Sequence, residues 1–409
     1  MSGSTRGRNL HRLLIAGQVA LTLLLMAGAG SAMKSFVALT HTPLGFGPDH
    51  VLSFDVTLPK GAKPSWQERV NSEEAVWLAL EQTPGVSSAG ISASWFPPLG
   101  GFRAKVEIQS KPTLTDSEAV MALVSPELFS TLHLPLLTGR VFNQTEVMNA
   151  AHLALVNQAF VKEYLADRNP LGQSVRSPML KFDQPSFVFA QAPDDWLQVI
   201  GIVGDTKNDG LQRPVKPMIF LPYTFVLPPD QVFFVRAKGD PETTIHSIRQ
   251  RLRELSSEFI VAESPNYTLT WRLDTQGWGQ ERFIAILFGL FALLALALAA
   301  TGLYSVVSFV VTQRTQELGI RMTLGARRGN VIQLVVVSTA TTLAVGIAVG
   351  LGLSVILGRL VTAWVGNSSR DPITLLAAAS VLFFVATIAC AFPAWRAASI
   401  DPMRALRTE

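Results

Sequence analysis

The stretch Gln313-Arg-Thr-Gln-Glu-Leu-Gly-Ile-Arg-Met-Thr-Leu-Gly-Ala-Arg-Arg328 lies between two long apolar runs, residues 283–311 and 331–357. Four of its five charged residues are arginines. Short loops rich in Arg and Lys stay on the cytoplasmic side of a membrane. We therefore expect two membrane helices joined by a cytoplasmic loop, residues 312–330.

One side of this loop is charged if the loop is helical. At 100° per residue, Arg314, Glu317 and Arg321 fall within about 60° of one another. Gly319 and Gly325 interrupt such a helix and allow a close approach. This pattern suits docking to a cytoplasmic partner. An ordinary positively charged loop that only fixes the topology is the alternative.

The composition is that of a membrane protein. The chain has 409 residues, of which 48% are hydrophobic and 16% are charged, whereas soluble domains average about 25% charged residues. Residues 38–282 carry 21 basic and 26 acidic side chains, and the rest of the chain carries 13 basic and 4 acidic ones. The excess positive charge thus flanks apolar spans, where membrane lipid explains it, and a nucleic-acid-binding domain is not indicated.

The first apolar run follows a basic N-terminus and has no charged residue between positions 13 and 33. About 20 apolar residues cross a bilayer as a helix. A cleaved signal peptide is the alternative, because residues 27–29 are small enough for a cleavage site. The apolar part of a signal peptide is only about 7–15 residues long. We therefore interpret residues 13–37 as a membrane span.

The last two apolar runs complete the membrane part. Gly346, Gly350 and Gly352 in the third span predict close packing against another helix. Pro393 is expected to end or kink the fourth span, residues 373–392. The apolar cores of the spans carry no ionisable residue, which argues against proton-coupled or ion-coupled transport.

The sequence predicts a multi-pass α-helical membrane protein with four transmembrane helices and one large α+β extracytoplasmic domain. In chain order the expected parts are a cytoplasmic N-terminus (1–12), transmembrane helix 1 (13–37), the extracytoplasmic domain (38–282), transmembrane helix 2 (283–311), the cytoplasmic coupling loop (312–330), transmembrane helix 3 (331–357), a short outer loop (358–372), transmembrane helix 4 (373–392) and a cytoplasmic C-terminus (393–409).

The large hydrophilic segment alternates between strand-like and helix-like patterns. The expected strands are residues 51–58, 105–109, 119–124, 196–204, 217–222 and 232–237, and the expected helices are residues 65–82, 157–165 and 241–257. Asp240 and Pro241 suit the start of the last helix. Pro and Gly at residues 96–101 and 226–230 predict seams between subdomains. These patterns favour an α+β domain with mixed sheets.

The usual motifs of catalysis and cofactor binding are absent from the sequence. It has no phosphate-binding loop of the G-x-x-x-x-G-K-[ST] type and no H-E-x-x-H, C-x-x-C or G-x-S-x-G motif. The Gly-rich residues 201–205 read as a strand end and a turn, and Asp194-Asp195 as a solvated turn. The only cysteine, Cys390, lies in an apolar run, and the six histidines have no ligand spacing. We expect no catalytic, cofactor or metal residue, so energy for any transport must come from another subunit.

Three groups of motifs carry a resemblance to a known family. Residues 313–326 (Q-R-T-x-E-L-G-I-R-M-x-L-G-A) and residues 393–406 (P-A-W-R-A-A-x-I-D-P-M-R-A-L) resemble the loop and the C-terminal motif of the MacB/FtsX-type ABC transporter permeases. Residues 124–140, 156–160, 170–172 and 199–205 resemble motifs of the MacB-type periplasmic core domain. Trp395 stands where a basic residue is common. Residues 14–30 are similar to the start of the second half of duplicated acidobacterial-type permeases, so the chain is expected to be a free-standing half or a fragment.

The resemblance implies a non-catalytic subunit of the inner membrane with both termini in the cytoplasm. A separate cytoplasmic ATPase dimer would bind ATP and Mg and push on the coupling loop, and the first two spans would relay this motion outward for efflux or export. It also implies a second permease half and a periplasmic adaptor as partners. The ATPase-coupling residues would be Arg314, Glu317, Gly319, Arg321 and Gly325, and those of the C-terminal tail motif would be Arg396, Asp401 and Pro402.

Two other functions are compatible with the sequence. An FtsX-like scaffold or sensor would regulate an extracytoplasmic partner, such as a hydrolase or a kinase, without exporting anything. A membrane-anchored enzyme would have its site in residues 38–282. Macrolides, lipoproteins, peptides and lipids are all compatible as substrates of an exporter.

Overall fold

The structure, a computed structural model, describes residues 5–57, 65–93, 101–109, 117–166, 168–180, 186–192, 195–255, 260–261, 267–313, 340–356 and 372–398. The chain divides into two compact units. The membrane unit comprises Met1–Thr40 and Gln280–Glu409, and the outer unit comprises His41–Gly279. The expected outer domain, residues 38–282, differs from this unit by three residues at each end.

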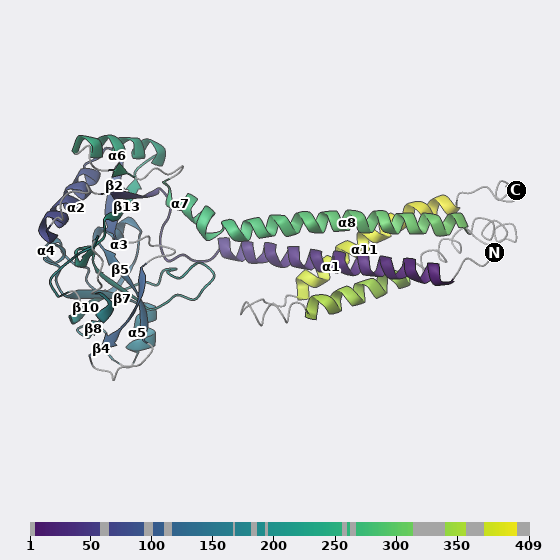
Figure 1. Cartoon of the computed structure of the whole chain (residues 1–409), viewed down its shortest axis with the longest axis horizontal. Coiled ribbons are helices and arrows are strands. Elements are labelled where there is room, and N and C mark those ends of the chain that lie inside the picture. Colours follow the sequence, from purple (N-terminus) through teal and green to yellow (C-terminus); the bar gives the residue numbers. More distant parts are fainter. Residues whose placement is uncertain are drawn as a thin grey trace. The chain divides into compact units, whose positions relative to one another are not determined.

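The membrane unit is helical (Figure 1). Its described helices are α1 (Thr5–Thr40), α8 (Gly279–Gln313), Ala340–Ile356 and α11 (Pro372–Ala398). Three stretches, Leu13–Thr40, Gly279–Phe309 and Pro372–Pro393, are long and apolar enough to cross a membrane. The expected third span, residues 331–357, is described only over the shorter helix Ala340–Ile356.

These helices share a core of aliphatic side chains. Val19 and Leu23 of α1 are fully buried and pack in one cluster with Leu303 of α8, Leu343 of the helix Ala340–Ile356 and Leu382 of α11. Branched and small residues at helical spacing bury one stripe of each helix, as expected from a 3.6-residue period. Large apolar side chains elsewhere on α8 are exposed, which suits contact with lipid.

Pro393 does not end α11. The helix continues five residues beyond it, to Ala398, although the apolar stretch long enough to cross a membrane ends at Pro393. Of the two expected effects of Pro393, ending the helix is wrong and a kink stays a prediction. A proline inside a helix removes one backbone hydrogen bond, which a long helix tolerates when neighbouring packing supports it.

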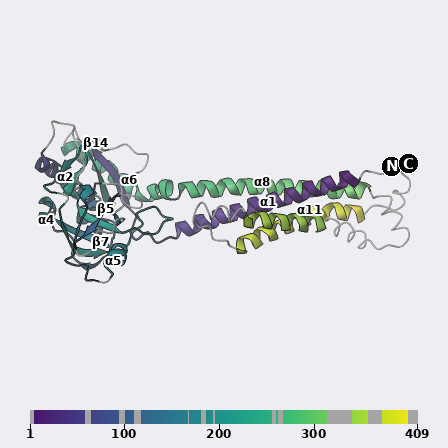
Figure 2. The same cartoon turned by 60° about the horizontal axis from the view of Figure 1, so that its bottom comes forward.

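The outer unit contains both strands and helices (Figure 2). Its described strands form one mixed sheet of twelve strands and a separate pair. The strand order is β14-β1-β13-β2-β5-β11-β7-β10-β8-β4, with β3 paired to β5 and β6 paired to β10. The strands are β1 (Val51–Thr57), β2 (Val86–Ser92), β3 (Phe102–Lys105), β4 (Glu107–Ile108), β5 (Glu118–Val124), β6 (Leu136–Gly139), β7 (Leu153–Asn157), β8 (Ser174–Arg176), β9 (Val188–Phe189), β10 (Leu197–Val203), β11 (Met218–Pro222), β12 (Val226–Leu227), β13 (Asp230–Ala237) and β14 (Ile260–Val261).

Parallel and antiparallel pairs both occur in this sheet. β11 runs parallel to β5 and antiparallel to β7, and β10 runs parallel to β7. All five residues of β11 are buried, as expected for a central strand covered on both faces. The α+β fold with a mixed sheet is therefore confirmed.

Helices cover the sheet. They are α2 (Trp66–Glu81), α3 (Glu127–Thr131), α4 (Gln144–Met148), α5 (Gln158–Tyr164), α6 (Pro241–Leu255) and α7 (Leu269–Arg272), with single turns η1 (Pro178–Leu180), η2 (Tyr223–Phe225) and the π-helical η3 (Leu273–Gly277). α2 packs on β2 and α6, while α3 packs on β2 and β13. Ser65 and Glu68 form a reciprocal capping box that starts α2. Asp240 Oδ2 accepts from the Thr243 amide, which confirms the expected start of α6.

The expected seam at residues 226–230 is not a boundary between subdomains, because His41–Gly279 forms one compact unit. The carbonyls of Pro228 and Pro229 instead accept hydrogen bonds from Arg69 Nη2, at 2.5 and 2.7 Å. The prolines therefore present acceptors to a buried guanidinium. The other expected seam, residues 96–101, lies outside the described residues except for Gly101.

A carboxylate lies in the core beside this guanidinium. Glu73 of α2 is fully buried and accepts from Arg69 Nε at 3.2 Å and from Gln231 Nε2 at 2.7 Å. Burial raises the pKa of Glu73 to about 8, although Arg69 and Gln231 favour its charged form. Two neighbouring polar atoms, Tyr223 Oη and Gln231 Oε1, have no hydrogen-bond partner among the described residues. The cluster therefore favours a neutral Glu73 at moderately acid pH.

The raised pKa of Glu73 predicts that the free energy of unfolding falls as the pH rises. The folded chain holds a proton that the unfolded chain releases above about pH 4.5, so the free energy of unfolding should fall by ~1.4 kcal/mol per pH unit between about pH 4.5 and 8. We expect Glu73→Gln to remove the contribution of Glu73 to this slope and to leave a smaller one. The melting temperature of the full chain in detergent, compared at pH 5 and pH 8, measures it, with Glu242→Gln as the control. Equal pH slopes in wild type and Glu73→Gln would contradict the prediction.

Candidate functional site: the anchors of the membrane helices

The residues that the sequence singles out for coupling lie mostly beyond the described part of the chain. Arg314, Glu317, Gly319, Arg321 and Gly325 all fall in residues 314–339, which the structure does not describe. In the tail motif, Arg396 belongs to α11, without a described side chain, and Asp401 and Pro402 lie outside the described residues. The structure therefore neither brings these residues together nor separates them.

Small residues let the membrane helices approach α1 closely. A Cβ atom built on Gly346 would lie 2.8 Å from Val19 Cβ, and one on Gly350 would lie 3.0 Å from Ala20 Cα. Gly352, in contrast, has no such neighbour within 4 Å in the described part of the chain. Two of the three glycines thus form the predicted packing face, and the third points elsewhere.

Packing at Gly346 should be sensitive to side-chain size. We expect Gly346→Leu to push the helix Ala340–Ile356 away from α1 and to cost roughly 1–3 kcal/mol, as overpacking of a close contact does. Gly352→Leu is the matched control, because it adds the same side chain in the same helix where space is open. Melting temperatures of the two full-length variants in detergent test this, and equal losses would contradict it.

α8 approaches α1 through polar and small groups. Thr22 Oγ1 of α1 lies 3.2 Å from the Ala295 carbonyl oxygen of α8 and 2.8 Å from the Gln18 carbonyl of its own helix. A Cβ on Gly302 would lie 2.7 Å from Gln18 Oε1. Side-chain hydrogen bonds and small residues are the usual means of joining helices in a membrane, so α1 and α8 form a packed pair.

The chain that follows α1 is fixed within the outer unit by backbone hydrogen bonds. The Leu44 carbonyl accepts from the Lys207 amide at 3.0 Å, and the Gly47 amide donates to the Leu132 carbonyl at 2.8 Å. Gly45 has a positive φ of 80°, and a Cβ there would lie 2.0 Å from the Asp205 carbonyl oxygen. Only glycine permits this approach. These contacts tie the segment to the outer unit before β1 begins.

Arg236 of β13 holds the same segment with three hydrogen bonds. Its Nη2 donates to the Gly47 carbonyl at 2.9 Å, its Nη1 to the Asp49 carbonyl at 2.7 Å, and its Nε to the Thr131 carbonyl at 2.8 Å. The planar guanidinium fork serves three acceptors that no other side chain could serve together. Partial burial lowers the pKa of Arg236.

The chain segment that precedes α8 is anchored to β1. The Ser53 amide of β1 donates to the Tyr267 carbonyl at 2.7 Å, and Leu52 pairs with Thr268 as an isolated bridge. Leu269 and Leu273 are fully buried. A π-helical turn, η3, separates α7 from α8, and such turns commonly mark functional positions in helices.

Both chain connections to the membrane helices therefore meet at one end of β1. The segment after α1 leads directly into Val51, and the segment before α8 pairs with Leu52 and Ser53. β1 in turn pairs along its whole length with β13. A displacement of either connection would act on this strand and, through β13, on the middle of the sheet.

Charged groups accompany the second anchor. Burial raises the pKa of Asp55, on β1, to about 6, while Arg272 of α7 opposes and Asp230 supports this rise. Burial lowers the pKa of Arg272 to about 10, opposed by Asp55. The two groups stabilise each other's charged form between these values. Asp55 therefore adds to the loss of stability expected with rising pH, over the range of about pH 4 to 6.

The described residues offer no metal site, since they contain no group of three or more His, Cys, Asp or Glu that could hold an ion.

The anchor residues Gly45, Arg236, Tyr267 and Leu273 were missed from sequence. One signal was available: Arg236 interrupts the apolar run 232–237, and a charge in a buried strand needs partners. The requirement for glycine at position 45 depends on a contact with residue 205, which the local sequence does not encode.

Two family models match the chain. Residues 17–255 match the MacB-like periplasmic core domain, and residues 289–402 match the FtsX-like permease C-terminal domain. Together they cover most of the outer unit and of the membrane unit, including residues 313–328, whereas residues 256–288 lie between the two matches.

Known proteins with related sequences include ATP-binding/permease proteins. The chain is 27% identical over 311 residues to the macrolide export ATP-binding/permease protein MacB of Neisseria gonorrhoeae, covering 71% of this chain and 44% of the relative. It is 26% identical over 342 residues to the MacB protein of Syntrophobacter fumaroxidans, covering 70% and 47%. The chain thus spans about half the length of the curated relatives it matches.

Solved structures match about half of the chain. The periplasmic region of MacB from Actinobacillus actinomycetemcomitans aligns with 13% identity and a TM-score of 0.35, covering 55% of this chain and 94% of that chain. The extracellular domain of the noncanonic ABC-type transporter YknZ from Gram-positive bacteria aligns with 10% identity and a TM-score of 0.33, covering 52% and 100%.

Proposed function

The chain belongs to the MacB/FtsX-type family of ABC transporter permeases, and on this basis we propose that it transmits ATP-driven motion of a separate ATPase to its outer unit. ATP and Mg would be bound by that partner. The chain itself would contribute no catalytic residue and no cofactor. Export or efflux is the proposed direction, because the named relatives are export proteins.

The observation that carries this proposal is the convergence of both anchors on one end of β1. A relay needs an element that both membrane helices can move and that passes the displacement on. Val51–Thr57 has contacts to both connections and full pairing with β13. Packed elements move as units rather than deform continuously, so a shift of α1 against α8 would reach the sheet through this strand.

The cytoplasmic contact is proposed for Arg314, Glu317 and Arg321, with Gly319 and Gly325 permitting close approach, while Arg396, Asp401 and Pro402 would add a contact from the tail. A cytoplasmic ATPase dimer and a second permease half are the proposed partners. We also propose a periplasmic adaptor and membrane lipid, a location in the inner membrane, and both termini in the cytoplasm.

A pull-down in mild detergent from native membranes tests the proposal. We expect recovery of a phosphate-loop ATPase, with two copies for two permease halves in the total mass of the complex. Recovery of the chain alone, at the mass of a monomer, would overturn it. Recovery of an extracytoplasmic hydrolase or a kinase without any ATPase would replace the relay by the scaffold function.

A further inference from the structure

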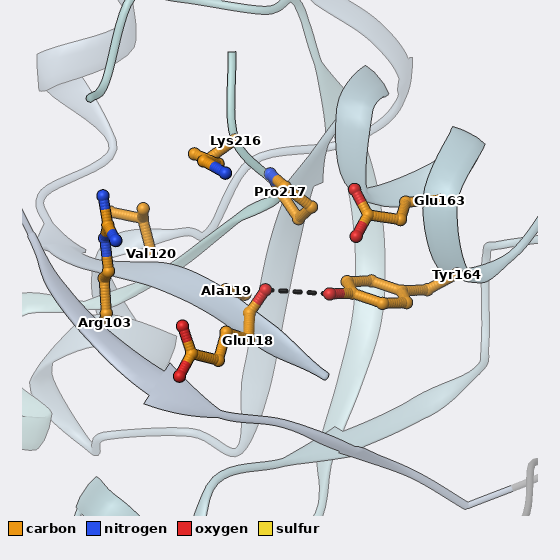
Figure 3. Close-up of a pocket in the computed structure, with 8 residues that line it drawn as sticks. All are labelled: Arg103, Glu118, Ala119, Val120, Glu163, Tyr164, Lys216 and Pro217. Atoms are coloured by element: carbon orange, nitrogen blue, oxygen red, sulfur yellow. Dashed lines mark hydrogen bonds between the residues drawn. The ribbon is translucent and has the colours of Figure 1, made fainter. Parts of the chain in front are cut away.

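A small hollow opens in the outer unit where two parallel neighbouring strands, β5 and β11, begin (Figure 3). Its walls come from β3, β5, the C-terminal end of α5 and the residues just before β11. The cavity volume is about 190 Å³. Sites for drug-sized ligands have volumes of ~300–1,000 Å³, so this hollow suits a smaller molecule.

Opposite charges face this hollow from separate elements. Figure 3 shows the Lys216 ammonium and the Glu163 carboxylate both pointing into it, with Arg103 on the side opposite Glu163. Neither Lys216 nor Glu163 forms an ion pair with any residue that the structure describes, whereas Arg103 Nη2 pairs with Asp209 Oδ1 at 2.5 Å. Glu118 of β5 adds a second carboxylate to the lining, so one ammonium and two carboxylates without an ion pair among the described residues face the hollow.

Buried amides fix the walls. Asn157 Oδ1 accepts from the Phe160 amide at 2.9 Å, which starts α5, and from the Met218 amide at 2.8 Å, which starts β11. Its Nδ2 donates to the Lys216 carbonyl at 3.0 Å. One buried side chain thus sets the position of the helix that bears Glu163 relative to the backbone of Lys216.

The buried side chains of Asn208 and Tyr164 also hold the backbone that lines the hollow. Asn208 exchanges hydrogen bonds with the Lys216 backbone, at 3.0 Å to the amide and 2.9 Å to the carbonyl. Tyr164 Oη donates to the Glu118 carbonyl at 2.9 Å. Burial and the neighbouring Glu163 raise the pKa of Tyr164 to about 12, so its hydroxyl stays protonated at neutral pH. Asn157, Asn208 and Tyr164 expose 1%, 3% and 5% of their surface, and such polar groups in a core fix geometry when they are satisfied.

We propose that this hollow binds a free α-amino acid with a small aliphatic side chain. The ligand carboxylate would lie on Lys216 and the ligand ammonium on Glu163, since an ammonium and a carboxylate that face one hollow match the two ends of a zwitterion. Ala119, Val120 and Pro217 form an apolar floor for the side chain. The proposal does not depend on the permease function, because it concerns the outer unit alone.

Calorimetric titration of the full chain in nanodiscs tests the site, with valine, N-acetylvaline and valinamide as probes. N-acetylvaline lacks the ammonium, and valinamide lacks the carboxylate. We expect valine to bind at least tenfold more tightly than either analogue. Undetectable binding of valine, or equal affinity for the three probes, would overturn the proposal.

Two variants assign the charges. Glu163→Gln should remove the preference for valine over N-acetylvaline but retain the preference over valinamide, and Lys216→Gln should do the reverse. Both side chains are exposed, so neither change should impair folding. Lys238→Gln and Glu242→Gln, exposed and elsewhere, are the controls. Unchanged selectivity in both pocket variants would place valine at another site and overturn the proposal.

Discussion

The exchanged pair Glu317→Arg and Arg321→Glu is expected to abolish co-purification of the ATPase while leaving the chain in the membrane. Both residues lie on the charged face predicted for the coupling loop. Reversing both would oppose like charges across an interface, which costs several kcal/mol, and we therefore expect affinity for the ATPase to fall at least ~100-fold. The fraction of ATPase recovered with the tagged chain from detergent extracts measures the effect.

The exchange keeps the net charge of the loop, so the positive-inside bias that orients the spans is unchanged. The matched control is the exchange Glu281→Arg with Arg282→Glu, at the other end of α8. It moves the same two charges where no ATPase contact is proposed. Normal recovery of the ATPase with the Glu317/Arg321 variant would remove these residues from the coupling interface.

The membrane helix α8 and the buried strands β11 and β13 were predictable from sequence, for a shared reason. Each of these elements coincides with a continuous run of mostly apolar residues in the sequence. α8, β11 and β13 overlap the expected residues 283–311, 217–222 and 232–237, respectively. Hydrophobic burial dominates these elements, so local composition is sufficient to locate them.

β2 and β7 were not predicted, because long-range packing creates them. β2 contains three serines in seven residues, and its Gly90 lies so close to α3 that a Cβ would come within 2.6 Å of Leu128 Cα. β7, Leu153–Asn157, contains only one β-branched residue and no aromatic one, and a short apolar run without such residues cannot be distinguished from a helix by its pattern. In both strands the neighbouring elements determine the conformation, as is common for β-structure.

One part of the candidate site, the coupling loop, was predictable from sequence, and the other part, the two anchors, was not. The coupling loop is recognisable from charge and glycine spacing within sixteen residues, and it stays a prediction because it lies outside the described residues. The anchors join positions far apart in sequence: Arg236 bonds to residues 47, 49 and 131. No local pattern encodes such contacts, so only the folded chain reveals that both connections meet at β1.

Arg236→Lys is expected to loosen the anchor that follows α1 without unfolding the outer unit. Lysine keeps the charge but cannot serve the carbonyls of Gly47, Asp49 and Thr131 together. Each acceptor left without its partner costs ~1–3 kcal/mol. We therefore expect backbone amides in residues 44–53 to exchange with solvent roughly tenfold to a hundredfold faster. Hydrogen–deuterium exchange of the full chain in detergent, read by mass spectrometry, measures this.

Arg253→Lys is the control, because Arg253 is an exposed arginine of α6. We expect this substitution to leave amide exchange in residues 44–53 unchanged. The pattern along the chain separates two causes. Faster exchange confined to residues 44–53 would locate the effect at the anchor. In the complex with the ATPase, we expect the same variant to keep ATP hydrolysis. We expect it to lose the slower amide exchange that ATP causes in β1. Faster exchange throughout β5 and β11 would mean that Arg236 stabilises the whole sheet, and unchanged exchange at the anchor would contradict its role there. Loss of protection in β1 alone, with hydrolysis intact, is the result that a mechanical relay through this strand requires.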